Sequence, residues 1–373
     1  MLEKNVKCVE GSFKEYYFNH LDLIHVPPRT SEREFGYQKF NAGMIRHLGI
    51  KDDKELHLLL MTQVPSDVYC SNAYYSFPNL PMSEKDWKEA DLIFDIDAKD
   101  LGLSCRKEHT CFKCSSCQNI IEQQSTCYKC GSSKFETISV ACQNCILESK
   151  KEVKKLVDVL TEDLGIIREE IQIYFSGNEG FHVHVTNSAY QNLDSRERAD
   201  LADYIMFNGI IPETLGMSKQ NNSEAFLPDI EEKGWRGRVA REIFGPKSKR
   251  PKIIQEILTG GYSFFQSKLE GMRQTIGVRI DPKVTMDVHR IFRLGGSINS
   301  KSGFSKAPCK DLESFDPFSD ACLLGDEKVE ILANCPLTFK LKNKKYGPYA
   351  NETISVPKHV AAYMICKGLA DIP

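Results

Sequence analysis

The sequence predicts a mixed α/β fold that carries a metal-binding insert and a mostly helical insert. Short apolar runs typical of strands alternate with helical patterns on both sides of a cysteine cluster at residues 105–145. A more polar region at about residues 194–274 lacks strand alternation, so we expect helices and loops there. With 373 residues, 41% of them hydrophobic, the chain is long enough for a large core and equals roughly two or three domains of ordinary size.

The predicted elements follow one another along the chain. Three strand-like segments precede the cysteine cluster, at residues 44–47, 58–63 and 90–97. After the cluster, residues 146–164 have helical periodicity and Gly165 is placed as a helix stop. Residues 171–175 then form an apolar strand that enters a tight turn. Beyond the helical insert, strand character resumes at residues 276–280, and a strand and turn pair covers about residues 288–304.

Composition and charge exclude several classes of protein. The 49 Lys and Arg residues nearly balance the 51 Asp and Glu residues, and the net charge of −2 excludes nucleic-acid binding by bulk charge alone. No apolar run approaches the ~18 residues that a membrane span needs, and the N-terminus has no secretory signal. We therefore expect an intracellular protein without membrane contact, whose clustered cysteines bind metal rather than form disulfides.

Two carboxylates, Asp95 and Asp97, stand at the end of the apolar run 91–97. In a strand both project from the same face, while Phe94 and Ile96 pack behind them. This arrangement suits Mg²⁺ or Mn²⁺, which take one or two carboxylates together with phosphate oxygens. The pair alone would equally fit a strand with acidic residues at the surface.

A glycine-containing turn follows the strand at 171–175. Gly177 and Gly180 let the backbone fold closely, so that amide N–H groups and the Ser176 hydroxyl are free to bind an anion such as a triphosphate. His182 follows on the next strand and points to the same side as His184. The alternative is a plain β-turn between two strands that carry histidines.

A third segment, residues 280–303, combines a carboxylate with cations. Asp281 lies beside a turn, and Arg290, Arg293 and Lys301 follow it. Carboxylates that hold metal and cations that hold phosphate are the two charge types that phosphoryl or nucleotidyl transfer needs. Surface salt bridges would explain the two arginines equally well.

Taken in this order, the three segments resemble the catalytic small subunit of archaeal and eukaryotic DNA primases, in the archaeo-eukaryotic primase superfamily. Phe175-Ser176-Gly177-x-x-Gly180-x-His182 is similar to the family's nucleotide-binding motif S-G-x-x-G-x-H, and Leu92–Asp97 to its metal-binding strand. Asp281-x-x-Val284-Thr285-x-Asp287-x-x-Arg290 resembles the strand that carries its third metal carboxylate. Two further parts of the chain resemble the same family, Arg33–Gly36 with Met44–His47 near the N-terminus and Val356–Tyr363 near the C-terminus. The resemblance to the family runs from about residue 10 to the end.

The resemblance implies one catalytic domain over residues 1–373, with the inserts 105–145 and 194–274 inside it. It implies that Asp95, Asp97 and Asp281 bind two divalent cations, Mg²⁺ or Mn²⁺. It also implies contacts to the phosphates of the incoming nucleotide from Ser176, Gly177, Gly180 and His182, with Arg46 and Arg293 nearby.

Two positions depart from the family pattern. Many relatives carry an arginine where this chain has Glu179, and a histidine where it has Asn299. A carboxylate that pointed inward would weaken a phosphate pocket, so we expect Glu179 to face solvent. Asn299 can donate a hydrogen bond but cannot carry a positive charge.

The cysteine cluster predicts two structural zinc sites. Cys114, Cys117, Cys127 and Cys130 have the paired spacing of a zinc ribbon, although Cys111 with Cys114 could replace the first pair. The remaining set is Cys105, His109, Cys142 and Cys145. Similar primases hold one zinc by such a Cys-His-Cys-Cys set after the carboxylate strand, so we expect the ribbon to be an insertion within it.

A basic stretch, Lys233–Lys252, holds eight Lys or Arg residues with Trp235 and Phe244 between them. It could follow a phosphate backbone and stack a base of a single strand, or it could be a solvated loop.

The function implied by the resemblance is template-directed, two-metal synthesis of short RNA primers, and also DNA primers, on single-stranded DNA from NTPs or dNTPs. The partner would be a primase large subunit in a heterodimer, and the location would be cytoplasmic if the source is archaeal. One alternative is a stand-alone primase-polymerase of repair or of a mobile element. Another is a non-catalytic, zinc-dependent subunit that binds nucleic acid.

Overall fold

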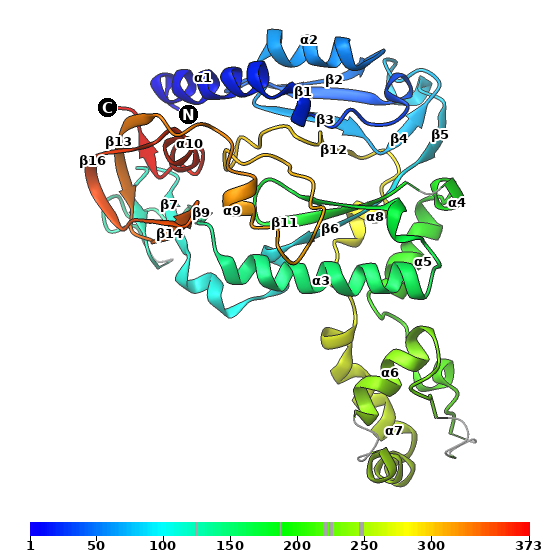
Figure 1. The fold of residues 1–373 in the computed structure, drawn as a ribbon. Helices are drawn as coiled ribbons and strands as arrows, with labels where there is room; N and C mark the ends of the chain where they lie inside the picture. The colour runs from blue at the N-terminus through cyan, green and yellow to red at the C-terminus, as the bar shows by residue number, and fades with distance from the viewer. Residues whose placement is uncertain (124–125, 187, 220–222, 224–226, 246–249) are drawn as a thin grey trace.

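Two antiparallel sheets face each other at the centre of the computed structural model, with helices on their outer sides (Figure 1). The first sheet has the strand order β12 (Ile291–Arg293), β3 (Asp67–Ser71), β1 (Glu34–Gln38) and β2 (Met44–Gly49), and the second β10 (Ile171–Phe175), β11 (Gly180–Val185) and β6 (Leu92–Asp97). The ring of Phe292 in β12 lies 5.8 Å from that of His182 and 6.0 Å from that of His184, so the sheets touch through these side chains. The structure describes residues 1–123, 126–186, 188–219, 223, 227–245 and 250–373.

Helices cover the outer side of each sheet (Figure 1). On the first sheet lie α1 (Glu3–Asn19) and α2 (Asp53–Gln63), and on the second α3 (Gln143–Glu162) and α5 (Ser195–Ile205). Helix α3 confirms the helix predicted from residue 146, because Val153, Leu156 and Leu160 are fully buried on one face. Together these elements confirm the mixed α/β class.

The strand predicted at residues 58–63 is wrong, since these residues form the second half of α2. The Asp52 side chain accepts a hydrogen bond from the Glu55 amide and caps the helix. Leu56 and Leu60, four residues apart, are fully buried, whereas Leu58 between them is exposed. The helical spacing of buried leucines over residues 53–63 therefore determines the structure here, and the short apolar run does not form a strand.

The region at residues 194–274 contains α5, α6 (Gly234–Phe244) and α7 (Arg250–Ile276), and its described residues contain no strand. Helices α6 and α7 project away from the two sheets (Figure 1). Residues 220–222, 224–226 and 246–249 of this region lie outside the described residues, as do 124–125 of the cysteine region.

The strand predicted at residues 276–280 is also wrong. Ile276 ends α7, and the segment after it makes only single backbone contacts, such as the bond from Val278 N to Ile205 O. At residues 288–304, the structure has β12 and an isolated bridge between Ile298 and Ser305, which agrees with a strand and a turn.

The remaining elements contribute to the main hydrophobic core, which extends from α1 to the C-terminus, or to two smaller clusters around Tyr75 and Val284. The cysteine region forms its own sheet of β8 (Ile120–Ile121), β7 (Thr110–Cys114) and β9 (Phe135–Ser139). The others are β4 (Ala73–Tyr75), β5 (Trp87–Ala90), α4 (Ser188–Gln191), α8 (Pro282–Met286), α9 (Pro317–Asp320), β13 (Lys328–Cys335), β14 (Phe339–Leu341), β15 (Lys344–Tyr346), β16 (Tyr349–Pro357), α10 (Lys358–Cys366) and β17 (Ala370–Asp371). Among the described helices, none is both long and apolar enough to cross a membrane.

Candidate active site and metal centres

Strands β6 and β11 place the candidate carboxylates and the candidate nucleotide turn side by side. In their antiparallel register, Asp95 lies opposite His182 and Asp97 opposite Gly180. Phe94 and Ile96 are fully buried behind β6, while both aspartates are partly accessible on its other face. This alternation is the one expected from the sequence. His182 Nε2 lies 3.4 Å from Asp95 Oδ1.

Asp281 reaches the same strand from a distant part of the chain. Its backbone N–H donates to Asp95 O at 2.9 Å. The family resemblance implied that Asp281 lies in a strand, but the structure places it at the N-cap of α8, where its side chain accepts from Lys283 N at 3.0 Å. Pro282 begins this helix, because proline favours the first helical position and cannot donate to a strand ladder.

The surroundings of Asp95 disfavour the charged form of its carboxyl. Burial raises the pKa of its carboxyl to about 7, and the neighbouring Asp97 and Asp281 carboxylates add to the rise. Its Oδ1 atom is buried and has no hydrogen-bond partner. A buried acceptor beside two further carboxylates fits a divalent cation, which would replace the missing partner and offset the charge.

Two side-chain hydrogen bonds stabilise the turn at residues 176–180, one within the turn and one from a neighbouring loop. Gly180 N donates to Ser176 Oγ at 3.3 Å, and Ser302 Oγ donates to Gly177 O. Gly177 has a φ of +84°, a conformation that glycine adopts without strain. A Cβ atom on Gly177 would lie 3.0 Å from Asn299 Cβ, so Asn299 packs directly against the turn.

Gly180 should not tolerate a side chain. A Cβ atom there would lie 2.3 Å from Ile96 O and 2.5 Å from Asp97 Oδ1. Gly180→Ala must therefore push β11 away from β6, and we expect a loss of about 2 kcal/mol in the free energy of unfolding and at least about a hundredfold in nucleotide incorporation. Thermal denaturation and a primer synthesis assay measure the two effects.

The matched control is Gly11→Ala in α1, where a Cβ atom would meet nothing within 4 Å. Alanine favours helix over glycine by up to about 1 kcal/mol, so this variant should be as stable as the parent or more stable. Equal behaviour of the two variants would contradict the close approach of Gly180 to β6.

The half-buried His182 and His184 of β11 lie beside the buried Lys306 on the side of the second sheet that meets the first. Burial lowers the pKa of His182 and of His184 well below the ordinary value, and the nearby positive charge of Lys306 lowers both further. Lys306 Nζ lies 3.2 Å from His184 Nε2 and donates to Arg293 O at 2.9 Å. His182 is therefore a neutral donor rather than a cation. Lys306 was not predicted from the sequence, because nothing in its local pattern distinguishes a buried lysine.

The two arginines expected near the phosphates both have carboxylate partners. Arg46 Nε lies 2.9 Å from Glu34 Oε1, and Arg293 Nη1 lies 2.7 Å from Asp67 Oδ1. Arg293 is close enough to His182 to lower its pKa, so it belongs to this side of the site. Asp67, which also accepts from the Ser300 hydroxyl at 2.6 Å, was missed because no sequence motif marks it.

Glu179 does not face solvent, contrary to the expectation. Its side chain is only 18% exposed, and it lies 3.1 Å from Arg106 Nη1 and 3.7 Å from Lys367 Nζ. Arg106 and Lys367 lie far from the turn in the sequence, and no sequence pattern predicted their contact with it. Their ion pairs with the Glu179 carboxylate keep this side chain inside the structure, away from open solvent.

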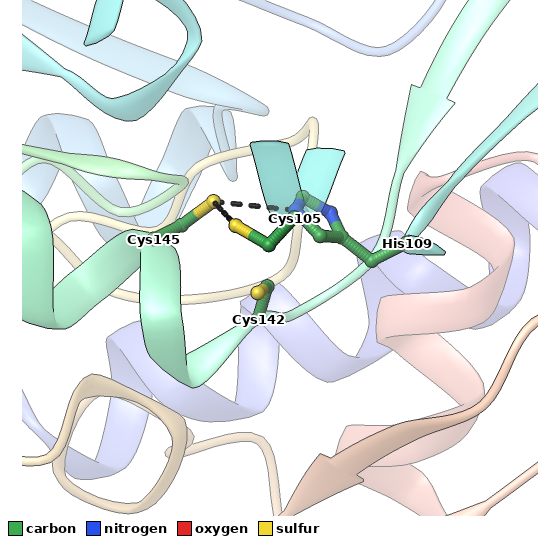
Figure 2. A group of neighbouring side chains, drawn as sticks. All are labelled: Cys105, His109, Cys142 and Cys145. Carbon is green, nitrogen blue, oxygen red and sulfur yellow. Dashed lines mark hydrogen bonds between the residues drawn. The ribbon is translucent and has the colours of Figure 1, made fainter. Parts of the chain in front are cut away.

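The first cysteine set comes together as predicted, and Figure 2 shows its four side chains converging. One ligand atom from each of Cys105, His109, Cys142 and Cys145 lies within 4.8 Å of all the others. Cys145 Sγ is 3.2 Å from His109 Nε2 and 3.8 Å from Cys105 Sγ. Cys145 lies in the first turn of α3, and Cys105 lies in a short 3₁₀ helix after β6. Thiolate and imidazole ligands in a group of four suit zinc.

The second set contains Cys117 and not Cys111. Ligand atoms of Cys114, Cys117, Cys127 and Cys130 also lie within 4.8 Å of one another. Cys111 is fully buried outside this group, and burial raises the pKa of its thiol to about 12. All 14 cysteines lie in the described part of the chain, and none of them forms a disulfide there. The two groups confirm that the chain can hold two metal ions by four protein ligands each.

The basic stretch at residues 233–252 does not offer a stacking platform. Trp235 is 4% exposed and Phe244 is fully buried, so neither ring can stack a base. Arg238 pairs with Glu162 and Asp163, which anchors α6 to the end of α3. Lys247 and Lys249 lie outside the described residues.

The chain is similar to DNA primase small subunits of known sequence. The family described as DNA primase small subunit matches residues 136–311. The DNA primase small subunit PriS of Nitrosopumilus maritimus is 61% identical over 372 residues, covering 100% of both chains. That of Cenarchaeum symbiosum is 52% identical over 99% of both, and that of Archaeoglobus fulgidus 29% identical over 96% of both. The chain belongs to the DNA primase small subunit family.

Proposed function

We propose that this protein is the catalytic subunit of a DNA primase, which joins nucleotides into short RNA primers, and also DNA primers, on a single-stranded DNA template. The observation that carries the proposal is the pairing of β6 with β11. It brings Asp95 and Asp97 next to the turn of Ser176–Gly180 and to His182 in a chain that is similar to primase small subunits over its full length.

In this proposal Asp95, Asp97 and Asp281 hold Mg²⁺ or Mn²⁺. Bound there, the cations would activate the primer 3′-hydroxyl and stabilise the departing pyrophosphate. The Ser176 hydroxyl, the turn amides and the neutral His182 would bind the triphosphate from the opposite side. Arg293 and Arg46 would add positive charge, each already oriented by its carboxylate partner.

Two further parts of the proposal concern zinc and partners. The two sets of four ligands would hold zinc ions that tie their loops together, because each set supplies the four protein ligands of a structural site. A primase large subunit would be the partner in a heterodimer, in keeping with the small-subunit name of the relatives.

The test is incubation of the full chain with a single-stranded template, labelled NTPs or dNTPs, and Mg²⁺ or Mn²⁺, with and without a candidate large subunit. We expect template-dependent oligonucleotides whose yield rises with the large subunit. Template binding without synthesis under all conditions would favour a non-catalytic subunit. Synthesis that is indifferent to the large subunit would favour a stand-alone primase-polymerase.

His182→Ala should raise KM for the nucleotide and lower kcat. A hydrogen bond to a charged phosphate contributes about 1.5 to 3 kcal/mol, so we expect a loss of roughly ten- to hundredfold in kcat/KM. Affinity for the template should hardly change, because His182 faces Asp95 and its side chain is only 14% exposed. Steady-state kinetics and a template-binding assay measure these effects.

The control is His57→Ala, since His57 lies on α2 at the outer side of the first sheet (Figure 1). This variant should keep the parent kinetics. Unchanged nucleotide kinetics in His182→Ala, or weakened template binding alone, would show that the turn does not bind the nucleotide.

A further inference from the structure

The turn at residues 176–180 packs directly against the first cysteine set. His109, Cys142 and Cys145 line one small cavity of about 10 Å³ together with Asn178 and Glu179 of the turn. The candidate nucleotide turn and the candidate zinc ligands are therefore neighbours, although they lie in separate parts of the sequence.

Glu179 makes the charged contacts across this boundary. Its Oε2 atom accepts from Arg106 Nη1 at 3.1 Å, and Arg106 is the residue after the ligand Cys105. Arg106 Nη2 also donates to Ser139 Oγ at 3.0 Å, at the end of β9. Arg106 thus joins the zinc-binding region to the turn through one carboxylate.

Lys367, just after α10, holds the other side of the turn. Its Nζ donates to Asn178 Oδ1 at 2.9 Å and lies 3.7 Å from Glu179 Oε1. The side chains of Arg106, Glu179 and Lys367 are 23%, 18% and 11% exposed, so water screens these contacts less than it screens surface pairs.

The backbone of Glu179 contacts the carboxylate strand. Glu179 O accepts from Ala98 N at 3.3 Å, one residue after Asp97, and the next residue, Gly180, pairs with Asp97. A shift of Glu179 would therefore move both the turn and the end of β6.

We propose that Glu179 is a positioning residue that couples metal occupancy of the first cysteine set to the geometry of the Ser176–Gly180 turn. The inference rests on the proposed function, since it assumes that the turn binds the nucleotide. A metal bound to Cys105 and His109 fixes the short segment that carries Arg106. Arg106 and Lys367 then hold Glu179 between them, and Glu179 holds the turn in its binding conformation.

Coupling of this kind is reciprocal in affinity, so nucleotide bound at the turn must strengthen zinc binding at the first set, and we expect this as slower release of zinc. The experiment follows zinc release to a coloured chelator, with and without ATP, in a Cys130→Ser background that disables the second set. Nucleotide affinity of each variant is measured separately by equilibrium dialysis of labelled ATP.

We expect ATP to slow zinc release on the order of fivefold when Glu179 is present, and less than twofold in Glu179→Gln. Arg106→Gln should lose the same protection, and the double variant Arg106→Gln/Glu179→Gln should lose no more than either alone. The matched control is Glu136→Gln, an exposed glutamate on β9 of the same region, which should keep the full effect.

The outcomes separate the inference from the proposed function. If labelled ATP binds but does not slow zinc release, or if Glu179→Gln keeps the protection, the coupling through Glu179 is refuted and the proposed function stands. If the parent protein binds no ATP, the proposed function fails and this inference falls with it. Loss of protection in Glu136→Gln as well would show a general effect of charge and would also refute the role of Glu179.

Discussion

Replacement of Asp95 by asparagine should abolish primer synthesis and at the same time make the fold more stable. The amide keeps the size of the side chain but cannot offset a divalent cation, so we expect a loss of several kcal/mol in transition-state stabilisation, or roughly a thousandfold in rate. Binding of the single-stranded template should stay nearly intact. A synthesis assay and a template-binding assay measure these two outcomes.

The gain in stability follows from the raised pKa of Asp95. The folded state binds this proton more tightly than the unfolded state, whose pKa is near the ordinary 3.8, so stability falls as the pH rises from about 4 to about 7. Above pH 7 the full cost of the buried charge remains, and Asp95→Asn removes it. We expect a gain on the order of 2 kcal/mol at pH 8 without added Mg²⁺ or Mn²⁺.

Denaturation of parent and variant from pH 4 to pH 8 measures the difference. It should grow with pH up to about 7 and shrink when Mg²⁺ or Mn²⁺ is added, because the cation stabilises only the parent. Asp200→Asn, an exposed change on α5, is the control and should alter neither rate nor stability. An Asp95→Asn variant that is less stable than the parent at pH 8 would contradict the destabilising effect of the ionised Asp95 carboxylate.

Loss of the first cysteine set should damage the protein far more than loss of the second. Cys145 is 3% exposed and His109 6% exposed, and Cys145 lies in the first turn of α3, whose apolar face packs into the main core. Cys130 of the second set is exposed. Because a structural metal contributes its binding energy to folding, we expect Cys145→Ser to lower Tm by about 10 °C or more, and Cys130→Ser by only a few degrees.

Metal analysis accompanies these variants. The parent should contain two zinc ions per chain and each variant about one, provided that the remaining set is intact. Equal losses of Tm in the two variants would contradict the difference in burial. A parent chain with one zinc or none would contradict the two-site arrangement.

Local patterns predicted the parts of the site that depend on local geometry. The alternation in β6 placed Asp95 and Asp97 on one face, because successive side chains of a strand always point to opposite sides. The spacing predicted both groups of ligands, since three of their four pairs are cysteines with two residues between them, a common spacing of zinc ligands. Even so, spacing alone left Cys111 and Cys117 as alternatives, and only the folded chain shows that Cys117 is the one that converges with the rest of the set.

Contacts between distant segments account for what the sequence could not predict. The surroundings of Glu179 depend on Arg106, 73 residues away, and on Lys367 near the C-terminus. The helical cap of Asp281 depends on how the segment after α7 meets β6. The run at residues 58–63 was too short to separate strand from helix, and the burial of Leu56 and Leu60 settled it.

Strand β6 stands at the edge of its sheet in the described part of the chain, and this position has a consequence for the solubility of inactive variants. An open edge invites pairing with a strand of another molecule, and charged side chains on the edge strand are a common defence against it. Asp95 and Asp97 supply that defence, while the bond from Asp281 N to Asp95 O covers a single point of the edge. A variant that neutralises both aspartates should therefore aggregate more readily than one that neutralises either. Inactive protein for complexes with template and nucleotide is better prepared with a single substitution.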